Sequence, residues 1–163
     1  MEKIRIFTVG GTIDKIYFDA KSRYEVGPPN IGEILSGLSL NPEFDVTSLM
    51  QKDSLDMSDA DRQQILEAVT TVREQRIIIT HGTDTMVQTA AVLSSLSDKV
   101  IVLTGALAPA RFAMSDATLN VGMALAAVQT QMPGVYIVMN GTVFPAKTVI
   151  KNRKLNRFES KSG

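Results

Sequence analysis

Two turns that contain threonine, each directly after an apolar run, carry the residues best suited to chemistry. The first is Gly10-Gly11-Thr12 after residues 3–9, and the second is His81-Gly82-Thr83-Asp84 after residues 76–80. In an open parallel α/β sheet, ligands bind at the carboxyl ends of the strands. The two turns can therefore face one crevice and present two hydroxyls, one carboxylate and several backbone N–H groups. Acyl transfer at an amide needs groups of these kinds.

The first turn offers the hydroxyl of Thr12 as a nucleophile. The two glycines before it allow a sharp turn and a close approach of the backbone to a ligand. The same tripeptide also fits an ordinary glycine turn, or a turn that grips phosphate after the first strand. Fold analogy does not establish a site, so this turn alone does not identify catalysis.

The second turn is more specific. Thr83 and Asp84 stand where a helix is predicted to begin, so either side chain could simply cap that helix. The functional interpretation gives the α-ammonium of an amino acid to Asp84 and a second hydroxyl at the reacting carbon to Thr83. We interpret His81, between strand and turn, as a structural hydrogen-bonding residue.

Two more polar residues are candidates for the same crevice. Ser54 follows the second predicted strand and could hold a substrate carboxylate, although a Ser/Asp turn explains it equally well. Lys151 lies beyond the last apolar run, among several basic residues. It could fold inward and act as a base, whereas the alternative is a solvated basic tail, and the sequence does not decide which lysine would do so.

The pattern of apolar residues predicts strands that alternate with helices. We expect a three-layer α/β fold over residues 1–163 as one domain, with a mostly parallel sheet and helices on both faces, flavodoxin- or Rossmann-like. Residues 14–29 read as a long loop or loose hairpin, and residues 142–150 as a strand or hairpin before a polar tail. Strands are expected at 3–9, 44–49, 76–80, 99–103 and 135–139, with helices from Asn30 as N-cap to 35, from Ser58 as N-cap to 72, from 83 to 93 and over 116–132.

Composition narrows the possible functions. The chain has 163 residues, 17 Lys and Arg, 17 Asp and Glu, one His and no Cys. A balanced charge argues against a nucleic-acid partner, and the lack of cysteine excludes disulfides and thiolate metal sites. No apolar run is long enough to span a bilayer and no secretory signal is visible, so we expect a cytoplasmic protein without a membrane partner.

Taken together, these motifs resemble the bacterial L-asparaginase family. The two threonine turns are joined by several further matching pieces, which occur in order over nearly the whole chain. The resemblance implies hydrolysis of L-asparagine to L-aspartate and ammonia, as in asparagine catabolism, with no metal and no cofactor. The further pieces are Tyr24-Glu25-Val26-Gly27, Ser54-Leu55-Asp56-Met57, Thr104-Gly105-Ala106, Val138-Met139-Asn140 and Thr142-Val143.

The resemblance also implies roles for individual residues. Thr12 matches the acylated nucleophile, and Tyr24 matches the lid tyrosine that orients it. Thr83, Asp84 and Lys151 match the second threonine and its aspartate and lysine partners. The match of Lys151 rests only on its spacing after Asn140-Gly141-Thr142-Val143.

The substrate-binding residues follow from the same resemblance. Ser54 matches the serine at the substrate carboxylate, and Gly11 and Thr83 would supply N–H groups for an oxyanion hole. Leu55 stands where many relatives have a polar residue that touches the substrate. This departure predicts a less enclosed site and a poorer KM.

The resemblance predicts a short form of the enzyme, because the chain stops about where the first domain of the family ends. The second domain of the family lends polar residues to a neighbouring site. We therefore expect an open site and a homo-oligomer, either a dimer or a tetramer. The main alternative is a non-catalytic module that senses asparagine or aspartate. A nucleotide-binding domain is less well supported, since the spaced glycines of such folds are missing.

Overall fold

The computed structural model describes residues 2–162, and its centre is a six-stranded sheet. The first five strands in the sheet order are parallel, and β8 runs antiparallel to β7. Counted along the chain, the parallel strands have the order 2-1-3-4-5 of flavodoxin-like folds, as expected. Across the sheet the strands are β4 (Phe44–Lys52), β1 (Ile4–Gly10), β5 (Arg76–Thr80), β6 (Val100–Thr104), β7 (Gly134–Met139) and β8 (Thr142–Pro145).

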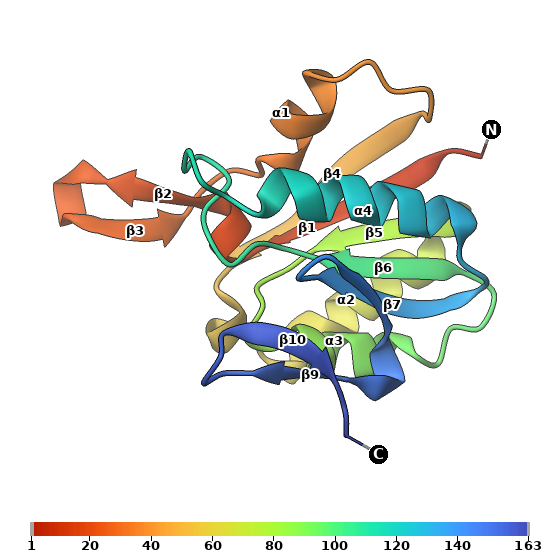
Figure 1. Ribbon diagram of the computed structural model, residues 1–163. Helices are drawn as coiled ribbons and strands as arrows, with labels where there is room; N and C mark the ends of the chain where they lie inside the picture. Colours follow the sequence, from red (N-terminus) through yellow and green to blue (C-terminus); the bar gives the residue numbers. More distant parts are fainter. Residues whose placement is uncertain (1, 163) are drawn as a thin grey trace.

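Helices cover both faces of this sheet (Figure 1). Helices α2 (Asp59–Thr71) and α3 (Met86–Leu93) pack on one face with Ile77 and Ile79. Helices α1 (Ile31–Ser36) and α4 (Ala117–Thr130) pack on the other face with Ile78. Strand β5 is buried on both sides because successive side chains point to opposite faces, and each face meets an apolar layer. The three-layer prediction is confirmed.

Two hairpins lie outside the central sheet. Strands β2 (Lys15–Phe18) and β3 (Arg23–Val26) form an antiparallel hairpin that projects beyond the carboxyl ends of the parallel strands (Figure 1). Strands β9 (Val149–Asn152) and β10 (Arg157–Ser160) form a second hairpin at the end of the chain. The prediction of a polar tail from Lys151 is therefore wrong. Phe158 is 2% exposed in the core, and its burial holds this segment against the domain.

Several helix ends differ from the sequence prediction. Ser58 caps α2 through a capping box, as predicted. Asn30 does not cap α1, because its side chain donates instead to the carbonyl of Ile13 at 3.2 Å. Helix α3 begins at Met86 rather than at residue 83. Within residues 2–162, four short 3₁₀ turns connect these elements: η1 (Thr12–Asp14), η2 (Asp19–Lys21), η3 (Ser54–Asp56) and η4 (Ala146–Thr148).

Among the helices of residues 2–162, none combines the length and the apolar character that a membrane crossing requires.

Candidate functional site

The two threonine turns lie side by side at the carboxyl ends of the parallel strands β1 and β5. The register between β1 and β5 aligns Thr8 with Thr80, so the turn after β5 begins beside the last two residues of β1. This is also the place where the order of the strands reverses along the chain. Open α/β sheets bind ligands at such a switch point, because the loops on its two sides diverge and leave a crevice.

Glycines allow three segments to meet in this crevice. Gly11 has φ +90°, and a Cβ built on it would collide with the backbone of Gly82. A Cβ on Gly82 would in turn lie 2.6 Å from the Cβ of Ser54. The turn after β1, the turn after β5 and the turn η3 are therefore in direct contact. No side chain larger than a hydrogen fits between them.

Lys151 joins the second turn from β9. Its Nζ donates to Thr83 Oγ1 at 2.8 Å and to Asp84 Oδ1 at 2.8 Å. The lysine side chain is 9% exposed, and that of Asp84 is 33% exposed. Lys151 is the lysine of the basic segment that makes these contacts. The residue pattern alone left that choice open, and only the spacing in the family resemblance pointed to Lys151. The same contacts also explain why α3 starts late, since neither Thr83 nor Asp84 has a capping contact and both side chains hold Lys151.

Ser54, the first residue of η3, is buried and 1% exposed. Its Oγ accepts the N–H of Thr85 at 3.3 Å, and its carbonyl accepts the hydroxyl of Thr85 at 2.8 Å. The serine is thus fixed against the second turn. Leu55, the next residue, turns outward and is 62% exposed.

An ion pair that sequence reasoning missed ties the β2–β3 hairpin to the Ser54 turn. Lys15 Nζ lies 3.0 Å from Asp53 Oδ2, and Asp53 also accepts the N–H of Leu55. Burial alone would raise the pKa of Asp53. The N–H of Leu55 and the charges of Lys15 and Lys151 more than offset that effect, so this pKa lies below its ordinary value. Only an acidic residue just before Ser54 hinted at this contact.

Thr12 and Tyr24 are not joined in this structure. Thr12 is half-buried in η1, and Tyr24 is 50% exposed on β3. Among residues 2–162, no hydrogen bond links them, and the ring of Tyr24 contacts Tyr17 and Phe112 instead.

Gly11 does not have the free N–H group that the oxyanion prediction requires. Its N–H donates to the carbonyl of Lys52 at 2.9 Å, which continues the pairing between β1 and β4. The sequence prediction of an oxyanion donor at Gly11 is therefore at odds with the structure. The role predicted for the N–H of Thr83 stays a prediction.

His81 has a structural role, as its position suggested. The ring is fully buried, with Nδ1 2.6 Å from the carbonyl of Gly82 and Nε2 2.7 Å from Thr89 Oγ1. A carbonyl can only accept, so Nδ1 carries the proton and Nε2 accepts from Thr89. Burial lowers the pKa of His81 to about 4, and the neutral ring then holds the second turn in place.

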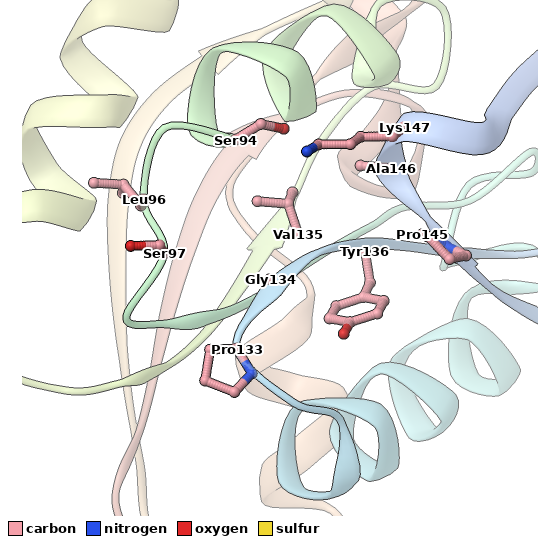
Figure 2. Close-up of a pocket in the computed structure, with 10 residues that line it drawn as sticks. All are labelled: Ser94, Leu96, Ser97, Pro133, Gly134, Val135, Tyr136, Pro145, Ala146 and Lys147. Carbon is pink, nitrogen blue, oxygen red and sulfur yellow. The ribbon is translucent and has the colours of Figure 1, made fainter.

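Among the cavities of residues 2–162, two lie at opposite ends of the parallel strands. A crevice of about 510 Å³ separates the β2–β3 hairpin from η3 and is lined by Lys15, Tyr24 and Asp53 among others. A second cavity of about 300 Å³, drawn in Figure 2, lies at the other end of the parallel strands, where β6 and β7 begin. Lys147 and Ser94 point into it. Within residues 2–162, no group of three His, Asp or Glu side chains is placed to hold a metal ion.

The fold and the site together define a class: a doubly wound α/β domain with a hydroxyl, lysine and carboxylate cluster at its switch point. Residues 3–162 match the family model described as "Asparaginase, N-terminal". The chain belongs to this asparaginase family.

Solved and curated relatives extend this likeness. The thermostable L-asparaginase of Thermococcus kodakarensis has a TM-score of 0.86 and 26% identity, over 97% of this chain and 51% of that one. The probable cytoplasmic L-asparaginase of Campylobacter jejuni has a TM-score of 0.83 and 27% identity, over 98% and 53%. L-asparaginase 2 of Escherichia coli is 29% identical over 93% of this chain and 47% of its own. The chain thus spans about half the length of these relatives.

Proposed function

We propose that this chain is an amidohydrolase that converts L-asparagine to L-aspartate and ammonia. The observation that carries the proposal is the contact of Lys151 with both Thr83 and Asp84, at 2.8 Å each, inside an asparaginase-family domain. The L-asparaginases among its relatives support the same substrate.

In the proposed mechanism, the hydroxyl of Thr12 attacks the side-chain amide carbon of asparagine. The new bond joins Thr12 Oγ1 to that carbon, the carbon–nitrogen bond breaks, and ammonia leaves. Water then attacks the ester and releases aspartate, which restores the hydroxyl of Thr12. Tyr24 orients Thr12 when the hairpin closes over the substrate.

The second turn moves a proton and binds the substrate. Thr83 Oγ1 accepts from Lys151, so its own hydroxyl can pass a proton to the leaving nitrogen. Thr83 takes up in exchange the proton that the hydroxyl of Thr12 loses, so that ammonia leaves and Thr83 is restored. Asp84 uses Oδ1 for Lys151 and keeps its other oxygen for the α-ammonium group of the substrate. Ser54 holds the α-carboxylate, Leu55 lines the open side, and the N–H of Thr83 faces the oxyanion.

The decisive experiment compares ammonia release from asparagine by the wild type, Thr12→Ala and Thr70→Ala. Thr70 lies exposed on α2 and is the matched control for a lost threonine hydroxyl. We expect activity to vanish in Thr12→Ala and to persist in Thr70→Ala. Equal activity in all three proteins would disprove the threonine nucleophile. Glutamine is assayed in parallel, because one extra methylene changes binding by only about 1–3 kcal/mol.

A non-catalytic asparagine or aspartate sensor is less well supported. A binding module has no need of the Thr83–Lys151 contact. It would reveal itself if asparagine raised the melting temperature of an inactive wild type.

We also propose that the protein is a cytoplasmic homo-oligomer, a dimer or tetramer. The similarity to the probable cytoplasmic L-asparaginase of Campylobacter jejuni supports the location. The formal net charge of +0 and the exposed Leu55 support self-association, since they leave little repulsion and an apolar contact at the site. Light scattering is expected to give a multiple of the 17.7 kDa chain mass, and a monomer at assay concentration would contradict it.

A further inference from the structure

One face of the β2–β3 hairpin is turned toward the site. The register pairs Tyr17 with Tyr24 and Lys15 with Val26, so these four side chains share a face. Lys15 reaches Asp53, beside Ser54, which shows that this face meets the body of the domain. Phe18 and Arg23 are on the opposite face of the hairpin.

Phe112, in the loop before α4, contacts the face of the hairpin that carries Lys15 and Tyr24. Its ring centroid lies 5.6 Å from that of Tyr24 with an angle of 70° between the rings, and Tyr17 and Tyr24 are 5.3 Å apart. Both are edge-to-face contacts, the geometry that aromatic rings prefer. Within the described part of the chain, the Phe112 contact is the aromatic contact that joins the hairpin to another segment.

The loop that carries Phe112 is braced and is connected to the turn of Thr12. The carboxylate of Asp116 accepts the N–H groups of Leu107 and Ala108 at 2.9 to 3.1 Å. Phe112 N–H donates to the carbonyl of Pro109 at 3.0 Å. Ala110 N–H donates to the carbonyl of Ile13 at 3.1 Å, one residue from Thr12. The position of the Phe112 ring is therefore set relative to Thr12.

We propose that Phe112 is a positioning residue that holds Tyr24 at the mouth of the site, ready to orient Thr12. The inference rests on the proposed function, in which Tyr24 acts on Thr12. Without the ring of Phe112, the outer half of the hairpin samples more positions, and Tyr24 is less often in the position from which the hairpin closes onto Thr12. An edge-to-face ring pair corresponds to about a two- to tenfold change in such a population.

The kinetic test uses Phe112→Ala with Phe18→Ala as its matched control. The rings of Phe112 and Phe18 are 43% and 42% exposed. Phe18 is on the β2–β3 hairpin, on the face opposite to Tyr24. We expect Phe112→Ala to lower kcat about two- to tenfold. KM for asparagine is expected to stay unchanged, because Ser54 and Asp84 are untouched. Phe18→Ala is expected to match the wild type, and Phe112→Tyr, which keeps the ring, to restore kcat. Equal kcat values for Phe112→Ala and the wild type would overturn the proposal.

A second readout does not depend on activity. The chain contains three tyrosines, so ring-labelled tyrosine gives three resolvable NMR signals, assigned with Tyr17→Phe and Tyr24→Phe. We expect the Tyr24 signal to shift in Phe112→Ala and to stay in place in Phe18→Ala. If the wild type releases no ammonia, the proposed function fails, and this spectrum alone decides whether Phe112 positions Tyr24. An unchanged Tyr24 signal in Phe112→Ala overturns the positioning role.

Discussion

Lys151 fixes the geometry of the second turn through two contacts of 2.8 Å. Lys151→Met keeps the length of the side chain and removes both hydrogen bonds. We expect turnover to fall by about 10²-fold or more, the range typical of lost proton transfer. Lys147→Met is the control. Lys147 is exposed and lies beside the cavity at the amino ends of the parallel strands, away from the second turn. Steady-state ammonia release measures both variants, and a similar turnover in the two would remove Lys151 from the mechanism.

The sequence predicted the two threonine turns at one crevice because strand ends and glycines are local features. Apart from the family resemblance, the residue pattern could not select Lys151, since that choice depends on which side of β9 faces inward. The alternation of buried Val149, exposed Ile150 and half-buried Lys151 carries that information. This alternation can be interpreted only when it is known that Phe158, on the paired strand β10, is buried in the core. Contacts such as Lys15 with Asp53 join distant segments and leave no local signal.

The contact between the turn after β5 and η3 depends on Gly82. A Cβ there would lie 2.6 Å from the Cβ of Ser54, so Gly82→Ala pushes the serine away from the second turn. We expect KM for asparagine to rise and the free energy of unfolding to fall by about 1–3 kcal/mol, the usual cost of overpacking. Denaturant unfolding and initial rates measure the two effects.

Gly122 provides the matched glycine for that experiment. It lies in α4, and a Cβ there meets no atom within 4 Å. Gly122→Ala should leave KM unchanged and raise the free energy of unfolding by up to about 1 kcal/mol, because alanine favours a helix. If Gly82→Ala behaves like Gly122→Ala, the three turns are not in the tight contact described above.

At the level of elements, the predicted central strands and the mostly parallel sheet were confirmed, since buried parallel strands read as continuous β-branched runs. The predictions failed where tertiary contacts replace local ones. Asn30 has the residue type of an N-cap, but its side chain is used at the foot of the β2–β3 hairpin. The β9–β10 hairpin was missed because its turn is polar and one buried ring, Phe158, holds it.

Across the whole molecule, two buried groups, Asp14 and His81, have opposite effects on stability in mild acid. Burial raises the pKa of Asp14 to about 6, despite hydrogen bonds from Asn30. Burial lowers the pKa of His81 to about 4. Below pH 6, the folded protein holds the Asp14 proton more tightly than the unfolded chain does, so acid favours folding. For His81 the unfolded chain binds the proton first, near pH 6.5, so acid favours unfolding.

The two effects have similar size, about 3 kcal/mol each, and they overlap between pH 4 and 6.5. We therefore expect them to cancel in the wild type, leaving little net contribution to the stability curve in this range. Asp14→Asn keeps an acceptor for the N–H of Asn30 but cannot ionise. This variant should be more stable than the wild type at pH 7, where the buried Asp14 of the wild type is ionised. It should lose that advantage toward pH 4, because Asp14 of the folded wild type is then protonated.

Denaturant unfolding at half-unit steps from pH 4 to 7 measures this difference, with Asp19→Asn as the control for an exposed carboxylate on the same hairpin. The Asp14→Asn curve should decline as the pH falls, whereas the Asp19→Asn curve should follow the wild type. Parallel curves for Asp14→Asn and the wild type would mean that Asp14 titrates alike in the folded and unfolded chain. The foot of the β2–β3 hairpin would then be open to water, and the hairpin would have no buried anchor next to Thr12.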